Sequence, residues 1–160
     1  MTEHTHVCSP EGNGRRTDTG YVVQVPVRWS DMDVYAHINH ARMVTLIEEA
    51  RIPFLFYDGR PTASLREGCV VADLHVRYRG QVRHDEGPIE VTMFVEQVRA
   101  VDFTVGYEVR PRGGAPDSRP AVTASTQLVA FDVAGQRLRR LTPAEKDYLG
   151  SFRRVDGKLP

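Results

Sequence analysis

The sequence lacks the features that mark membrane-spanning, exported and nucleic-acid-binding proteins. No run approaches the roughly 18 apolar residues of a transmembrane helix, and the first residues, Met-Thr-Glu-His-Thr-His, give no signal-peptide core. Lys plus Arg and Asp plus Glu each number 21, so the net charge is zero. A nucleic-acid binder usually has a basic excess, and a membrane-surface protein a cationic amphipathic helix. We therefore expect neither partner.

Cysteine is scarce as well. Cys8 and Cys69 stand far apart and form no disulfide framework, which fits a reducing cytoplasm. Cys69 opens an alternating strand, where a buried thiol is usually inert, so a Cys–His catalytic site is not favoured. A chain of 160 residues can bury a core without disulfides. The sequence therefore predicts a cytoplasmic globular protein.

Several well-known site motifs are missing. No GxSxG elbow, P-loop or GxGxxG run is present, so serine-hydrolase and nucleotide-binding folds lack support. Asp31-x-Asp33 could start a calcium loop, but Tyr35 and Ala36 stand where Asp or Asn and Gly are needed. A metal shared by two nearby histidines would need a third ligand, and none stands at helical spacing. We expect no metal and no cofactor.

Five segments alternate apolar and polar side chains with the period of two that is typical of strands. They cover residues 21–29, 72–79, 89–96, 103–110 and 120–132. Pro26 cannot donate a ladder hydrogen bond, so the first strand is expected at an edge or bulged there. The short link at Val101-Asp102 and the Gly113-Gly114 loop predict successive antiparallel hairpins.

Two helices are predicted. The first has an apolar stripe, begins after Asn39 as N-cap, and is kinked or ended by Pro53. Its stripe consists of Met43, Ile47, Ala50 and Phe54. The second begins with the capping box Thr142-Pro143-Ala144-Glu145, and Gly150 can stop it.

This order predicts one α+β domain in which a helix covers one face of an antiparallel sheet. Residues 1–20 hold almost no apolar side chains and are expected to form a disordered tail. The domain is expected over residues 21–153, and residues 154–160 form a C-terminal tail.

Polar groups gather between the first strand and the long helix, in residues 29–40. The first backbone N–H groups of a helix lack internal partners and can hold an oxyanion. A carboxylate just upstream, as at Asp33, can attack the polarised carbonyl or activate a water molecule. The alternative is that Asp31 and Asp33 only cap a turn or the helix.

Three stretches of this region carry a resemblance to a known family. They are Val27-Arg28-Trp29-Ser30-Asp31-Met32-Asp33, His37-Ile38-Asn39-His40-Ala41 and Glu48-Glu49-Ala50-Arg51. Together they resemble the hotdog-fold acyl-CoA thioesterases, above all the 4-hydroxybenzoyl-CoA thioesterase-like group. The likeness extends from about Val22 to Leu149, and residues 27–51 are its distinctive part. It implies an antiparallel five-stranded sheet wrapped around a long central helix, and hydrolysis of an acyl-CoA thioester to free acid and CoA.

The resemblance also implies a site. The family's catalytic aspartate falls on Asp33, and the helix-start position seven residues later is His40, whose backbone N–H would point at the thioester carbonyl. In some members a histidine side chain there also assists catalysis. Asn39, Ala41 and His37 would contact the substrate. A thiolate leaves readily because its conjugate acid has a pKa of about 8.5, so one carboxylate, as nucleophile or base, suffices.

Some details of the family differ or stay open. Ala36 stands where many members carry glycine. Other hotdog thioesterases place their acid in mid-helix, but Glu48 and Glu49 both lie off the apolar stripe, and Glu48 is better placed to pair with Arg51. The alternative functions are a hotdog hydroxyacyl-thioester dehydratase, which His40 and Glu48 could mimic, and a non-catalytic acyl-CoA-binding protein.

A single sheet leaves exposed strand edges that need pairing or covering. Hotdog proteins usually pair two sheets edge to edge, with active sites between subunits, so a homodimer or homotetramer is expected. Arginines on the later strands could meet CoA phosphates, although a solvated strand residue is the commoner role. They are Arg77, Arg79, Arg83 and Arg99. The sequence does not identify the acyl group, nor whether its carrier is CoA or an acyl carrier protein.

Overall fold

The computed structural model describes residues 14–160. Its strands are β1 (Gly14–Arg16), β2 (Tyr21–Val25), β3 (Cys69–Tyr78), β4 (Ile89–Val98), β5 (Asp102–Arg110), β6 (Val122–Asp132) and β7 (Arg137–Leu138). Its α-helices are α1 (His40–Arg51) and α2 (Pro143–Gly150). Shorter helices are η1 (Trp29–Asp31), the π-helix η2 (Ile52–Phe56), η3 (Ala63–Glu67) and η4 (His84–Glu86). Cys8 and most of the predicted N-terminal tail lie outside the described residues.

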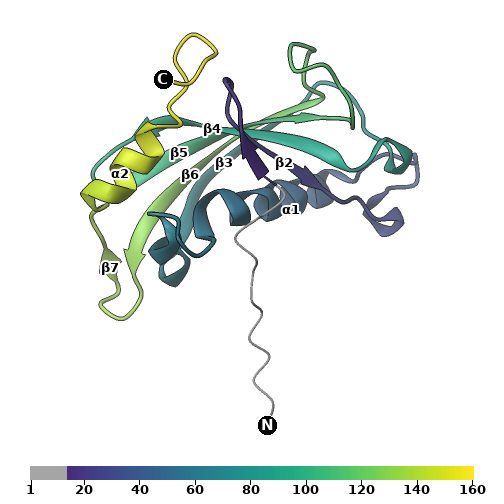
Figure 1. Ribbon diagram of the computed structural model, residues 1–160. Coiled ribbons are helices and arrows are strands. Elements are labelled where there is room, and N and C mark those ends of the chain that lie inside the picture. Colours follow the sequence, from purple (N-terminus) through teal and green to yellow (C-terminus); the bar gives the residue numbers. More distant parts are fainter. Residues whose placement is uncertain (1–13) are drawn as a thin grey trace.

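The strands form one antiparallel sheet in the order β1-β2-β4-β5-β6-β3, with β7 beside β6. The sheet is curved, and α1 lies along its concave side, while α2 packs near one end (Figure 1). The predicted α+β class, with a long helix wrapped by an antiparallel sheet, is confirmed. Both predicted hairpins, β4–β5 and β5–β6, are present.

The sheet has more strands than the five predicted from alternation. The predicted strands correspond to β2 through β6, and β1 and β7 raise the number to seven. Both extra strands are too short for an alternation pattern to show. β2 also stops at Val25, earlier than predicted, because Pro26 falls immediately after it rather than at a bulge.

The folded part also extends beyond residues 21–153 at both ends. β1 lies within the predicted disordered tail, yet Arg16 Nη2 donates to the Ser151 carbonyl at 2.9 Å. At the other end, Leu159 N donates to the Asp18 carbonyl at 2.8 Å. The two segments predicted as tails are joined by polar contacts of this kind. A pattern of hydrophobic residues does not predict such contacts.

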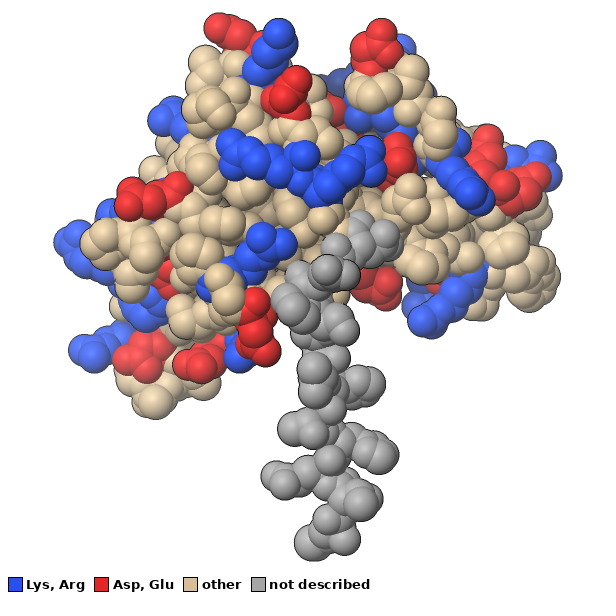
Figure 2. All heavy atoms as spheres, in the orientation of Figure 1, with Lys and Arg blue, Asp and Glu red and all other residues tan. Residues whose placement is uncertain are grey.

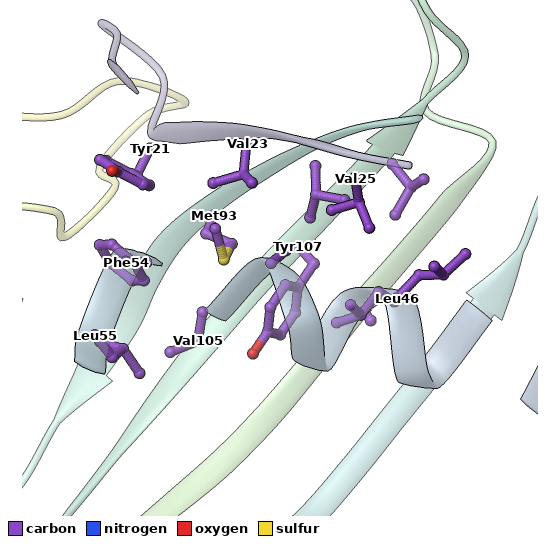
Figure 3. Packing of buried hydrophobic residues seen from close by; sticks show 14 of the residues in the cluster. Tyr21, Val23, Val25, Leu46, Phe54, Leu55, Met93, Val105 and Tyr107 are labelled. Carbon is purple, nitrogen blue, oxygen red and sulfur yellow. The ribbon is translucent and has the colours of Figure 1, made fainter. Parts of the chain in front are cut away.

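The core lies between α1 and the sheet. Ala50 and Phe54 are fully buried on the predicted stripe of the helix. Figure 3 shows side chains from β2, α1, β4 and β5 filling this space. They include Tyr21, Val23, Val25, Leu46, Met93, Val105 and Tyr107. At Pro53, which lacks an N–H, the helix changes to the π-helix η2, so the predicted interruption is confirmed.

The predicted capping box of α2 is also confirmed. Thr142 Oγ1 accepts from Glu145 N at 3.2 Å, and Glu145 Oε2 accepts from Thr142 N at 2.7 Å. Glu145 is buried, and its Oε1 also accepts hydrogen bonds from Arg139 Nη2 at 2.9 Å and from Ser64 Oγ at 3.0 Å. This network joins α2 to η3 and to the segment after β7.

The surface matches the balanced composition. Acidic and basic side chains are interspersed over the face shown in Figure 2. Among the helices of residues 14–160, none is long and apolar enough to span a bilayer.

Candidate active site

The loop between β2 and α1 folds back on itself. Met32 and Ile38 form an isolated antiparallel bridge, and Asn39 N donates to the Asp31 carbonyl at 2.8 Å. Ile38 N in turn donates to the carbonyl of the buried Val82 at 2.8 Å. These bonds fix the loop as a tight turn and tie it to the segment that follows β3.

The structure separates the roles of the two aspartates. Asp31 is only 9% exposed, and its Oδ2 accepts a hydrogen bond from Arg28 N at 2.7 Å, which closes η1. Its carboxylate is therefore used to stabilise the turn. For Asp31 the capping alternative considered from the sequence is the one observed.

Asp33 is held differently. Its Oδ1 accepts from the backbone N–H of Tyr35 at 2.8 Å and of His37 at 3.3 Å. Within residues 14–160, Oδ2 of Asp33 accepts no hydrogen bond. One carboxylate oxygen thus fixes the orientation of the group, and the other has no partner among the described residues.

Ala36 lies at the tip of this turn with φ of 59°, in the left-handed region that favours glycine. Its N–H donates to the Asp33 carbonyl at 3.1 Å. The turn therefore explains physically why glycine suits this position. Alanine, with the smallest side chain after glycine, adopts the same turn at a modest strain.

The helix start is capped as predicted. Asn39 Oδ1 accepts from Ala41 N at 2.9 Å, and the Asn39 carbonyl accepts from Met43 N at 2.9 Å. His40 is the exposed first residue of α1, and in the part of the chain that the structure describes its backbone N–H donates no hydrogen bond. The N–H of Ala41 is occupied, whereas His40 supplies an open donor at the start of this turn.

His37 is half-buried, and both its backbone N–H and its carbonyl are bonded to Asp33. Its Nδ1 is buried without a hydrogen-bond partner among residues 14–160. The backbone polar groups of His37 are therefore both used within the turn, whereas Nδ1 of its ring is not.

Asp33 lines a cleft of about 830 Å³ between this loop and η4. One wall consists of Trp29, Ser30, Met32, Val34 and Ala36, and the other of Arg83, His84 and Asp85. His37, Asn39, His40 and Ala41 are not among the lining residues. The structure therefore brings Asp33 together with Arg83, and places the helix start beside the cleft rather than within its walls.

Trp29, 81% exposed, and His84 are cleft residues that the sequence did not single out. Trp29 had a signal, its place within the polar loop. His84 had none, because only the fold brings η4 next to the loop. The same holds for Tyr78, whose hydroxyl donates to the His40 carbonyl at 2.8 Å.

The two helix glutamates are turned away from the core. Glu48 Oε1 lies 3.4 Å from Arg51 Nη2, and the Glu48 side chain is 66% exposed. The predicted helix pair of Glu48 and Arg51 is therefore present. Glu49 is also exposed.

The four candidate phosphate-binding arginines differ in their surroundings. Arg83 Nε lies 3.5 Å from Asp85 Oδ1 and lines the cleft. Arg99 pairs with Asp102 at 3.6 Å. Arg77 and Arg79 line a separate hollow of about 300 Å³, which does not include Asp33. Arg83 alone of the four shares a cleft with Asp33.

A larger hollow, of about 950 Å³, lies along the β6–β7 hairpin, away from Asp33. Two of its arginines are paired with acidic side chains, since Arg137 pairs with Asp132 at 3.2 Å and Arg139 with Glu145 at 2.9 Å. Size alone therefore does not identify the site.

The thiol of Cys69 is not activated as a nucleophile. Burial raises the pKa of the free Cys69 thiol to about 11, against which the charges of Arg51 and Arg139 act only partly, so the thiol stays protonated at neutral pH. Within residues 14–160 no group of three or more His, Cys, Asp or Glu side chains could hold a metal ion.

The sequence profile of the thioesterase-like superfamily matches residues 27–152 of the chain. Comparison with curated protein sequences gives no match. The matched range includes the aspartate loop, α1 and every strand from β3 to β7.

Several solved structures share the fold of this chain. A thioesterase from Thermus thermophilus, complexed with coenzyme A and Zn, has 21% identity and a TM-score of 0.67 over 82% of this chain and 92% of its own. The probable thioesterase YbaW from Escherichia coli has 20% identity and a TM-score of 0.68 over 83% and 98%. A DHNA-CoA thioesterase from Staphylococcus aureus has 22% identity and a TM-score of 0.62 over 75% and 79%. The shared fold is the predicted hotdog fold.

Proposed function

The chain belongs to the thioesterase-like superfamily and is a thioester hydrolase; from this premise we propose that it hydrolyses an acyl-CoA thioester to the free acid and CoA, with Asp33 as the catalytic carboxylate. The main support is the difference between the two aspartates. The carboxylate of Asp31 accepts a hydrogen bond that closes η1, whereas Asp33 lines a cleft and, among residues 14–160, one of its carboxylate oxygens has no hydrogen bond.

In this proposal the thioester carbonyl oxygen accepts a hydrogen bond from the open backbone N–H of His40. Loss of such an oxyanion donor typically costs about 2.7–4 kcal/mol. Asp33 then acts in one of two ways. As a base it takes a proton from water, whose oxygen bonds to the carbonyl carbon; as a nucleophile it forms an acyl anhydride that water then cleaves. Both routes break the C–S bond and release CoA as a thiol.

The cleft suits the leaving group. Arg83, 58% exposed at its side chain, offers a guanidinium for a phosphate, and the exposed Trp29 offers an aromatic face for a flat ring. The structural relative from Thermus thermophilus carries coenzyme A, which supports CoA as the carrier. The remaining substrate contacts are assigned to the His37 ring, Asn39 and Ala41.

We also propose a homodimer in which two β3 strands pair edge to edge, and a homotetramer as a pair of such dimers. In the described residues β3 is hydrogen-bonded to β6 on one side only. Apolar side chains along it are largely exposed, among them Val71 at 50% and Leu74 at 40%. A second copy would satisfy the open edge and cover this surface. The free thiol of Cys69 supports a reducing cytoplasm as the location.

No contact in the described residues favours the dehydratase alternative. It would use the side chains of His40 and Glu48, which stand eight residues apart on α1, about 12 Å along its axis. Glu48 instead pairs with Arg51. Thiol release from short, long and aromatic acyl-CoAs tests the hydrolase directly, because neither a dehydratase nor a non-catalytic binder would release the thiol.

A further inference from the structure

One hydrogen bond links the edge strand to the helix start. Tyr78 is the last residue of β3, and its hydroxyl donates to the backbone carbonyl of His40, the first residue of α1, at 2.8 Å. Over residues 14–160 this is the only side-chain hydrogen bond between β3 and α1. It joins positions 38 residues apart in the chain.

The same segment also anchors the other half of the site. Val82 follows Tyr78 by four residues, and its carbonyl accepts from Ile38 N in the aspartate loop at 2.8 Å. Tyr78 therefore fixes the helix start, and Val82 fixes the loop that carries Asp33. Residues 78–82 therefore contact both the start of α1 and the loop that carries Asp33.

We propose that Tyr78 is a positioning residue of the thioesterase reaction, which holds the first turn of α1 so that the open N–H of His40 and the carboxylate of Asp33 keep their relative placement. This inference rests on the proposed function. The Asn39 cap satisfies the turn locally but does not tie it to the sheet. Without the Tyr78 hydroxyl, the helix start can shift against the loop, and a shift of about 1 Å can cost roughly a hundredfold in rate.

The exposure of Tyr78 and a comparison with Tyr148 separate a positioning role from a purely structural one. Tyr78 is 49% exposed, so its ring adds little to the core. Tyr148 provides a matched comparison, because its hydroxyl donates to the Phe54 carbonyl at 2.7 Å, at the opposite end of the same helical segment. Both tyrosines bond a backbone carbonyl of this segment, but only Tyr78 does so at the active site.

The test compares Tyr78→Phe, Tyr148→Phe and the wild type in steady-state thiol release and thermal unfolding. We expect Tyr78→Phe to lower kcat by roughly tenfold or more with little change in KM, and Tyr148→Phe to keep the wild-type kcat. Amide hydrogen exchange adds a readout independent of turnover. The Val44 N–H lies one helical turn after the His40 carbonyl and bonds to it by α-helical geometry, so it should exchange faster in Tyr78→Phe alone.

The outcomes are distinguishable. If Asp33→Asn abolishes turnover while Tyr78→Phe keeps the wild-type kcat, the positioning role is overturned and the proposed function stands. Equal losses of kcat in both tyrosine variants would also overturn it, since the bond would then be structural only. Absence of thiol release by the wild type would overturn the proposed function and this inference together.

Discussion

The backbone N–H of Asp33 donates to the His37 carbonyl at 2.8 Å, and the His37 N–H donates back to Asp33 Oδ1 at 3.3 Å. This reciprocal pair fixes both the turn and the direction of the carboxylate before any substrate arrives. Electrostatic groups that need no reorganisation during the reaction are the most effective catalytically. The rigid turn is therefore part of the proposed catalytic apparatus.

The turn depends on the small residue at position 36. In Ala36→Gly we expect retained thiol release and a change in unfolding free energy below about 1 kcal/mol, because relief of strain offsets added freedom of the unfolded chain. In Ala36→Val a β-branched side chain meets the φ of 59°, which should cost about 1–3 kcal/mol and lower kcat. Urea unfolding and thiol release measure both effects. Equal kcat for the glycine and valine variants would contradict this role of the turn.

The helix glutamates should be dispensable for chemistry. Glu48→Gln removes the charge of a 66% exposed side chain, while the oxygen of the new amide can still accept a hydrogen bond from the buried Arg51 guanidinium. We expect kcat/KM to stay within about threefold for Glu48→Gln and Glu49→Gln, because neither side chain touches the reacting atoms. Thiol release by each purified variant measures this. A loss comparable to that of Asp33→Asn would instead assign the catalytic carboxylate to the helix.

The open edge of β3 should be an interface. A charge at Leu74, which is 40% exposed on β3, should disfavour edge-to-edge pairing. In sedimentation we expect the wild type at twice the 18.0 kDa chain mass or more, and Leu74→Lys shifted toward the monomer. Leu138→Lys on β7, where the leucine is 59% exposed, is the matched control and should sediment like the wild type. A monomeric wild type would contradict the proposed assembly.

Acid should weaken the α2 network. Burial alone raises the pKa of Glu145, but hydrogen bonds from Arg139, the Thr142 backbone and Ser64 outweigh it and hold that pKa below its usual value. As pH falls below about 4.3, the unfolded chain binds this proton first, so the stabilisation present at neutral pH is lost.

We therefore expect Glu145→Gln to cost about 2 kcal/mol at pH 7, with a smaller difference from the wild type at pH 3. Urea unfolding at the two pH values measures this. A difference that is the same at both, or larger in acid, would show that the Glu145 charge does not carry the stabilisation.

Local chemistry determined which features were predictable from sequence. The Thr142–Glu145 capping box depends on residues within one helical turn, and the structure contains it. Pro53 likewise interrupts the helix as its missing N–H dictates. Strands β3 to β6 were visible because alternation over eight or more residues leaves a clear pattern, and β2, with five residues, was visible because the alternation continues beyond it to Trp29.

Contacts between distant segments were not predictable. Arg16 contacts Ser151 from the other end of the chain, and because the sequence does not show this contact, it predicts a disordered tail where the structure has β1. The distinction between Asp31 and Asp33 also needed coordinates, because composition offers both as caps. Similarly, nothing in an alternating strand marks Tyr78 as the residue that reaches the helix start.

The central claim is that Asp33, and not Asp31, is the catalytic carboxylate. We would compare thiol release from a panel of short, long and aromatic acyl-CoAs by the wild type, Asp33→Asn and Asp31→Asn, with folding checked by circular dichroism. Asparagine at position 31 can still accept from Arg28 N, so that variant should keep most activity. The account predicts that Asp33→Asn loses at least about a hundredfold in kcat/KM. A folded Asp33→Asn that hydrolyses the panel like the wild type would contradict it.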